Sequence, residues 1–100
     1  MSLQQLDKTN FDHTIANGIA LVDFYADWCP SCRLLSHVMN EVAHERQDVT
    51  VGKLNIDSED ELAAKYRVKS IPTLIVFKNG EEKTRLVGAK SKRAILAALS

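Results

Sequence analysis

Three runs of apolar and β-branched residues stand out along the chain, at residues 19–25, 50–56 and 73–77. The run at 19–25 is nearly continuous in apolar character, without the alternation of a strand that has one face in water. Such runs are typical of parallel sheets, in which helices cover both faces. We therefore predict three buried strands at the centre of the fold.

Two weaker segments are predicted to complete the sheet. Residues 3–6 are consistent with a short edge strand. The pair Asn79-Gly80 favours a type I′ turn, so residues 81–87 are expected to form a hairpin with the preceding strand until Gly88 ends it.

Helical patterns separate these strands. One extends to about Arg46, and its apolar residues recur at helical spacing at Leu34, Leu35, Val38, Val42 and Ala43. Capping signals predict three more helices. They are Asn10 for residues 11–16, with Gly18 as the stop, Ser58 with Glu61 for residues 59–66, and Ser91 for the segment carrying Ile95, Leu96 and Leu99.

The resulting order, βαβαβαββα, predicts an α/β fold with a mixed sheet. One hundred residues, 45% of them apolar, suit a single domain at 1–100. Lys plus Arg equals Asp plus Glu at 13 each, so no nucleic-acid or membrane footprint is visible. No apolar run approaches the roughly 18 residues of a membrane span. Residues 1–10 lack a secretory pattern, and we expect a cytoplasmic monomer.

The only cysteines of the sequence, Cys29 and Cys32, form a Cys-x-x-Cys motif between a strand and a helix. In a βαβ context this spacing indicates thiol–disulfide chemistry. Cys29 lies at the expected helix start, where free amide groups and the helix dipole favour a thiolate, and Pro30 suits the first helical position. We expect Cys29 to attack a substrate disulfide. Cys32, one turn further and more buried, is expected to resolve the mixed disulfide.

Two other interpretations of the cysteine pair carry less weight. A fixed disulfide closing so small a loop would constrain the unfolded chain little. A zinc site usually needs four ligands, and His13, His37 and His44 are not paired at ligand spacing. We therefore predict no metal site.

Asp23 interrupts the apolar run at 19–25. Burial of a carboxylate is costly unless it is protonated or paired, and it raises the pKa. Since its strand leads into the cysteine motif, Asp23 is a candidate proton carrier for Cys32, although a structural acid with a satisfied hydrogen bond is the alternative. Lys53 in the next strand is either the partner of Asp23 or a lysine whose amine reaches solvent.

Two further segments are candidates for substrate contact. Ile71-Pro72 precedes a strand, and from the residues alone a trans peptide is the default. Trp28 is either a core residue or part of a contact surface beside the reactive sulfur.

Together these residues make the chain resemble the thioredoxin family over nearly its whole length. The resemblance is carried by Leu21-Val22-Asp23-Phe24, Trp28-Cys29 to Cys32, Lys53-Leu54-Asn55-Ile56-Asp57, Ile71-Pro72-Thr73-Leu74, Phe77-Lys78-Asn79-Gly80 and Val87-Gly88-Ala89.

The resemblance implies a thioredoxin fold, with a mixed five-stranded sheet flanked by four helices. It implies a protein-disulfide reductase in which Cys29 is the nucleophile, Cys32 the resolving thiol, and Asp23 with Lys53 the buried proton-transfer pair. It also implies a cis Pro72. The predicted substrate contacts are Trp28, Pro30, Ser31, Ile71, Pro72, Gly88 and Ala89. No bound cofactor is expected; a thioredoxin reductase, an NADPH-dependent flavoprotein, would recharge the dithiol, and disulfide-containing client proteins would be the substrates.

The sequence also departs from the family pattern. Pro30-Ser31 stands where thioredoxins usually carry Gly-Pro, Tyr25 replaces a usual tryptophan, His37 replaces a proline and Ser70 a frequent glycine. We hypothesise that Ser31 stabilises the Cys29 thiolate and makes the protein more oxidising than an ordinary thioredoxin. A thiol oxidase or isomerase on the same fold, and a non-catalytic binding subunit, are the alternative functions.

Overall fold

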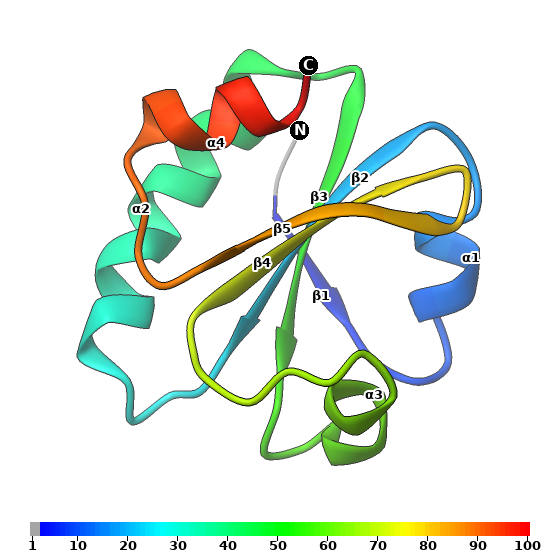
Figure 1. Ribbon diagram of the computed structural model, residues 1–100, viewed down its shortest axis with the longest axis vertical. Helices are drawn as coiled ribbons and strands as arrows, with labels where there is room; N and C mark the ends of the chain where they lie inside the picture. The colour runs from blue at the N-terminus through cyan, green and yellow to red at the C-terminus, as the bar shows by residue number, and fades with distance from the viewer. Residues whose placement is uncertain (1–2) are drawn as a thin grey trace.

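The computed structural model describes residues 3–100, and its five strands form one mixed sheet in the order β1-β3-β2-β4-β5 (Figure 1). β2 pairs in parallel with β3, as β1 does, whereas β4 is antiparallel to both β2 and β5. The strands are β1 (Gln4–Leu6), β2 (Ile19–Tyr25), β3 (Val49–Asn55), β4 (Thr73–Lys78) and β5 (Glu81–Val87). The predicted fold class is confirmed, with each predicted strand found within one residue of its expected bounds.

Four helices cover the two faces of the sheet (Figure 1). They are α1 (Phe11–Ile15), α2 (Pro30–Glu45), α3 (Asp60–Lys65) and α4 (Lys92–Ala98). Buried side chains of α2 and α4 share one core cluster with the sheet, and α1 and α3 pack against a second cluster on the opposite face. Within residues 3–100, no helix combines the length and the apolar character needed to cross a membrane.

The central strand β2 contributes side chains to both core clusters, because successive side chains of a strand point to opposite faces of the sheet. Leu21 belongs to the α2/α4 cluster, and Val22 and Phe24 belong to the α1/α3 cluster. The same alternation directs Asp23 toward α2. β2 then ends beside the first turn of α2, which places the cysteine motif over the end of the sheet that carries Asp23.

Two of the predicted helix caps are wrong. The Asn10 side chain makes no cap; its Oδ1 accepts a hydrogen bond from the Asp7 amide instead. The Ser58 hydroxyl donates to the Asn55 carbonyl, and α3 begins only after Glu59, without a side-chain cap. In both places the polar side chain makes its hydrogen bond within a tight turn before the helix, and so it does not cap the helix. Ser91 does cap α4, because its Oγ accepts from the Ala94 amide at 3.2 Å.

The predicted hairpin is confirmed. Asn79 and Gly80 have φ angles of +51° and +87°, and they connect β4 to β5 as a two-residue turn. Two successive positive φ angles are what a type I′ turn requires, which explains the Asn-Gly pair. The Asn79 side chain also accepts a hydrogen bond from the Gly18 amide, which links the hairpin to the start of β2.

Candidate active site at the Cys29–Cys32 disulfide

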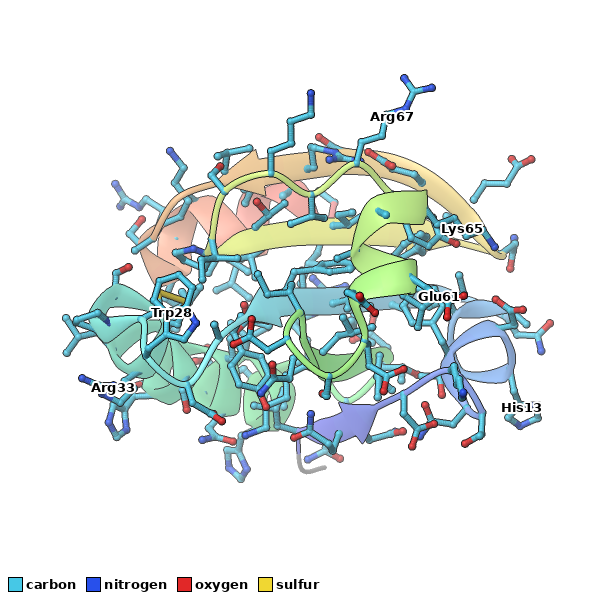
Figure 2. All side chains as sticks on the ribbon, turned by 90° about the horizontal axis from the view of Figure 1, so that it is seen from below. His13, Trp28, Arg33, Glu61, Lys65 and Arg67 are labelled. Carbon is cyan, nitrogen blue, oxygen red and sulfur yellow. A yellow bond between two sulfur atoms is a disulfide. The ribbon has the colours of Figure 1, made fainter. Side chains whose placement is uncertain are left out.

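Cys29 and Cys32 are joined by a disulfide at the start of α2, with their Cα atoms 5.2 Å apart. Cys29 is the N-cap residue and Pro30 is the first residue of the helix, as predicted. Figure 2 shows the disulfide at the edge of the molecule beside Trp28. The end of β2 and the start of α2 therefore hold the two sulfurs next to exposed Trp28, with both cysteines themselves buried.

The sulfur of Cys29 receives two polar contacts. The Cys32 amide donates to Cys29 Sγ at 3.2 Å, and the Ser31 hydroxyl lies 3.4 Å from the same sulfur. The 16-residue helix α2 also directs the positive end of its dipole at this position, and its first turn contains no acidic side chain. These groups favour negative charge on Cys29 once the disulfide is reduced.

Burial does not separate the two cysteines as the sequence analysis expected. The exposed fraction is 4% for Cys29 and 3% for Cys32. The physical reason is that Tyr25, Ile56 and Ile71 pack around both residues. The two sulfurs differ instead in their neighbours, since only Cys32 of the pair lines the pocket described next.

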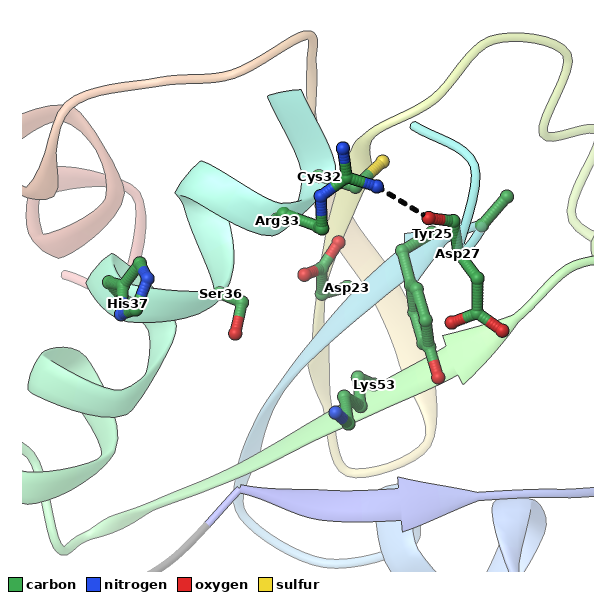
Figure 3. A pocket seen from close by; sticks show the side chains of 9 residues that line it. Asp23, Tyr25, Asp27, Cys32, Arg33, Ser36, His37 and Lys53 are labelled. Atoms are coloured by element: carbon green, nitrogen blue, oxygen red, sulfur yellow. Dashed lines mark hydrogen bonds between the residues drawn. The ribbon is translucent and has the colours of Figure 1, made fainter. Parts of the chain in front are cut away.

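A pocket of about 320 Å³ lies beside Cys32, between α2 and the sheet (Figure 3). Asp23 and Tyr25 of β2, Lys53 of β3 and His37 of α2 line it. The pocket thus connects the sulfur of the second cysteine with a carboxylate, an amine and an imidazole.

Asp23 is 2% exposed, and its Oδ1 has no hydrogen-bond partner among residues 3–100. Burial raises the pKa of Asp23 to about 7, and the positive charge of Lys53 opposes this rise only in part. At neutral pH the carboxyl therefore exists in both protonation states, which suits a group that accepts and returns a proton.

Lys53 lies directly opposite Asp23 in the parallel pairing of β2 and β3. In the described part of the chain, however, no nitrogen of Lys53 lies within 4.0 Å of a carboxylate oxygen. Its Nζ lies over the Tyr25 ring instead, 5.4 Å from the centroid. Lys53 thus acts on Asp23 through its electric field and without the direct contact that we considered.

Of the predicted substrate-contact residues, Trp28 directly precedes Cys29 and Ile71 packs against the cluster that contains both cysteines. Trp28 is 66% exposed, and its Nε1 donates to Asp57 Oδ2 at 2.9 Å, so Trp28 is a surface residue and not a core residue. The Ile71-Pro72 peptide is cis, as the resemblance implied and against the expectation from the residues alone. The Gly88 amide donates to the Pro72 carbonyl at 2.8 Å. Pro30 and Ser31 lie between the cysteines, and Ala89 is exposed next to Gly88.

Sequence reasoning missed two side chains that organise this site. The carboxylate of Asp57 orients Trp28, and the ring of Tyr25 binds the Lys53 amine. A signal for Tyr25 was present, because residues two apart on a strand share a face and Tyr25 is two residues after Asp23. The contact of Asp57 with Trp28 joins residues 29 positions apart and has no local signal.

A family model described as thioredoxin matches residues 2–100. A thioredoxin from Chlamydia pneumoniae is 49% identical over 87 residues, which cover 87% of this chain and 85% of that protein. The chain belongs to the thioredoxin family. A bifunctional thioredoxin reductase/thioredoxin from Mycobacterium leprae is 45% identical over 102 residues, which cover all of this chain and 22% of that protein. The solved structure of a mutant thioredoxin from Halobacterium salinarum superimposes with a TM-score of 0.92 at 33% identity, and the match covers 98% of this chain and 88% of that one.

Family membership and the Cys29–Cys32 disulfide together show the activity. The protein is a thiol–disulfide oxidoreductase that reduces disulfides by dithiol–disulfide exchange. Thioredoxins use this redox-active disulfide in place of a bound cofactor. Among residues 3–100, no three His, Cys, Asp or Glu side chains are grouped in a way that could hold a metal ion.

Proposed function

We propose that Cys29 is the sulfur that attacks the disulfide of a client protein. The Cys29 thiolate forms a bond to one client sulfur, the client S–S bond breaks, and the departing client thiolate takes a proton from water. The contacts of Cys29 Sγ with the Cys32 amide and the Ser31 hydroxyl support this assignment, as does its place at the N-terminus of α2.

In the second step Cys32 releases the client. Its thiol proton passes to the Asp23 carboxylate, the Cys32 thiolate attacks Cys29, and the second client sulfur leaves as a thiolate. The client has then gained two electrons, and Cys29 and Cys32 are again a disulfide. The observation that carries this step is the pocket shared by Cys32 and Asp23, where burial raises the pKa of the acid to about 7.

The surface around the disulfide is proposed to bind the client backbone. It comprises Trp28, Ile71, Pro72 and Gly88, with Pro30, Ser31 and Ala89 at its margin. Exposed Trp28 contributes apolar surface that a client can contact. The hydrogen bond from the Gly88 amide to the Pro72 carbonyl holds the two loops that carry these residues together. Clients are expected to be proteins with an accessible disulfide.

A flavoprotein reductase that takes electrons from NADPH is proposed to recharge the dithiol. The relative from Mycobacterium leprae that carries both names, thioredoxin reductase and thioredoxin, supports such a partnership. We further propose that the chain works in the cytoplasm as a monomer; its two cysteines do not make the disulfide scaffold that is common in small secreted proteins, which supports the location.

The test is the reduction of a model disulfide protein, coupled to NADPH through a thioredoxin reductase. We expect steady NADPH consumption that depends on this protein and that stops when Cys29 is replaced by serine. Activity of Cys29→Ser equal to the wild type would overturn the assignment of the nucleophile. Asn40→Ala, at an exposed position of the same helix, serves as the control for handling and folding.

A further inference from the structure

Two groups could bind the Lys53 ammonium: the carboxylate of Asp23 and the ring of Tyr25. The parallel register places Lys53 opposite Asp23 on neighbouring strands. All three side chains line the same pocket, shown in Figure 3. Oδ1 of Asp23 is left without a hydrogen-bond partner among the residues described, so no other donor there competes with the ammonium for this oxygen. The ammonium nevertheless lies over the ring, 5.4 Å from its centroid, which is within the range of a cation–π interaction.

The ring itself is fixed by the edge of the sheet. The Tyr25 hydroxyl donates to Gln5 Oε1 at 3.3 Å, and Gln5 Nε2 donates to the Lys53 carbonyl at 3.5 Å. One glutamine on β1 thereby connects the tyrosine of β2 with the backbone of the lysine on β3. This connection holds the face of the ring beside the lysine side chain.

We infer that Tyr25 is a positioning residue whose ring holds the Lys53 ammonium away from Asp23, so that this carboxyl keeps no ion-pair partner in the pocket beneath Cys32. An ammonium in direct contact would favour the ionised carboxylate and make it a weaker proton acceptor. The ring therefore preserves the proton affinity that the second step of the proposed function uses, and the inference rests on that proposed step.

Other ionisable side chains line the same pocket. They are Arg33 and His37 of α2 and Asp27 of the loop after β2. Arg33 donates to the Asp27 carbonyl at 2.8 Å, and the residue opposite Asp23 on β4, Leu74, carries no charge. Lys53 is the charge whose effect on the pKa of Asp23 is resolved. It is therefore the group through which a change at Tyr25 would reach the acid.

The test measures the titration of Asp23 in the oxidised protein, where the disulfide sulfurs do not titrate. The carboxyl carbon of Asp23 is followed by NMR from about pH 4 to pH 9 in the wild type, Tyr25→Leu, Lys53→Met and the double variant. We expect Tyr25→Leu to lower the midpoint by roughly half to one pH unit, because the freed ammonium moves onto the carboxylate. In the Lys53→Met background, the same change at Tyr25 should leave the midpoint unmoved.

Three results would overturn the inference. Two of them are a midpoint of Asp23 that does not change in Tyr25→Leu and a midpoint that rises. The third is a midpoint that falls equally in the presence and absence of Lys53, which would mean that the smaller side chain merely admits water to Asp23. Tyr25→Phe keeps the ring and should retain most of the wild-type midpoint, which guards against a folding defect in Tyr25→Leu.

A kinetic control separates this inference from the step on which it rests. If Asp23→Asn released clients from the mixed disulfide as fast as the wild type at every pH, the role of Asp23 in that step would fail. The NMR titration would still decide whether Tyr25 controls the position of Lys53, because it reports on the acid directly.

Discussion

The two faces of the sheet differ in the side chains that cover them. On the α1/α3 face, Phe11, Phe24, Tyr66 and Phe77 form an aromatic cluster whose neighbouring ring centroids are 5.3 to 6.4 Å apart. On the α2/α4 face the core is aliphatic, and at the end nearest the cysteines it gives way to a polar pocket. One face therefore contains tight apolar packing throughout, whereas the other contains a buried acid.

Adjacent residues of β2 illustrate the difference. Phe24 is fully buried among aromatic rings. Asp23, its neighbour, is buried in the pocket that Cys32 also lines, and one of its oxygens has no hydrogen-bond partner within residues 3–100. Burial of Phe24 stabilises the fold, and burial of an ionised Asp23 destabilises it. The comparison shows that apolar burial on one face offsets the cost of burying a carboxyl on the other, and our proposal gives that carboxyl a role in proton transfer.

The largest effect is expected for the cysteines themselves. Cys32→Ser should lose turnover completely and accumulate a covalent complex with clients through Cys29, because the second step has no resolving sulfur. Cys29→Ser should lose turnover without forming that complex. Non-reducing gel electrophoresis with a model disulfide protein distinguishes the two variants, and the opposite pattern would reverse the assigned roles.

On the aromatic face, Phe77→Ala should reduce the free energy of unfolding by about 3–5 kcal/mol through loss of apolar burial and ring contacts. Since the aromatic cluster contains no carboxyl, amine or imidazole, this loss should be the same at pH 5 and pH 8. Urea unfolding at the two pH values measures it, with Phe77→Leu as a milder variant. A loss that changed with pH would contradict the contrast between the two faces.

On the functional face, Asp23→Asn should raise the free energy of unfolding at pH 8. The pKa of Asp23 is about 7 in the folded protein against the ordinary value of 3.8, so the contribution of Asp23 to stability is fully present below pH 4 and is lost as the pH rises through 7. The gain from Asn should therefore approach about 4 kcal/mol at high pH, an upper bound, and vanish near pH 4. A gain that does not vary with pH would show that Asp23 ionises normally.

The smallest effect is expected at Ser31. Its hydroxyl lies 3.4 Å from Cys29 Sγ, and a hydrogen bond to the thiolate would favour the reduced form. Ser31→Ala should make the redox potential more negative by roughly 20–30 mV, the equivalent of about 1 kcal/mol for two electrons. Equilibration with glutathione measures it. Asn40→Ala, at an exposed uncharged position of α2, should leave the potential unchanged, and an unchanged potential in Ser31→Ala would refute the hypothesis.

Much of the fold could be predicted because its strongest signals are local. The apolar runs at 19–25, 50–56 and 73–77 correspond to β2, β3 and β4, and Asn79-Gly80 marks the hairpin. The caps at Asn10 and Ser58 failed because polar side chains near a helix start also stabilise turns, and the choice between the two depends on the preceding residues.

The sequence singled out the residues of the candidate site, but their contacts could not be predicted from it. Asp23 and Lys53 stand out because charged side chains are rare in apolar strands, and the cysteine spacing is itself a signal. The partner of the Lys53 amine depends on strand register and on the position of the Tyr25 ring, which no local pattern encodes. The near-equal burial of the two cysteines likewise depends on Ile56 and Ile71 from distant segments.

The most direct test of the account is the order in which the two cysteines of the reduced protein react. Brief alkylation at pH 7, read by mass spectrometry of the peptides, should modify Cys29 well before Cys32, because α2 and its amide groups favour the Cys29 thiolate. Preferential modification of Cys32, or no reaction at either sulfur while the protein stays folded, would contradict the proposal that Cys29 begins each cycle.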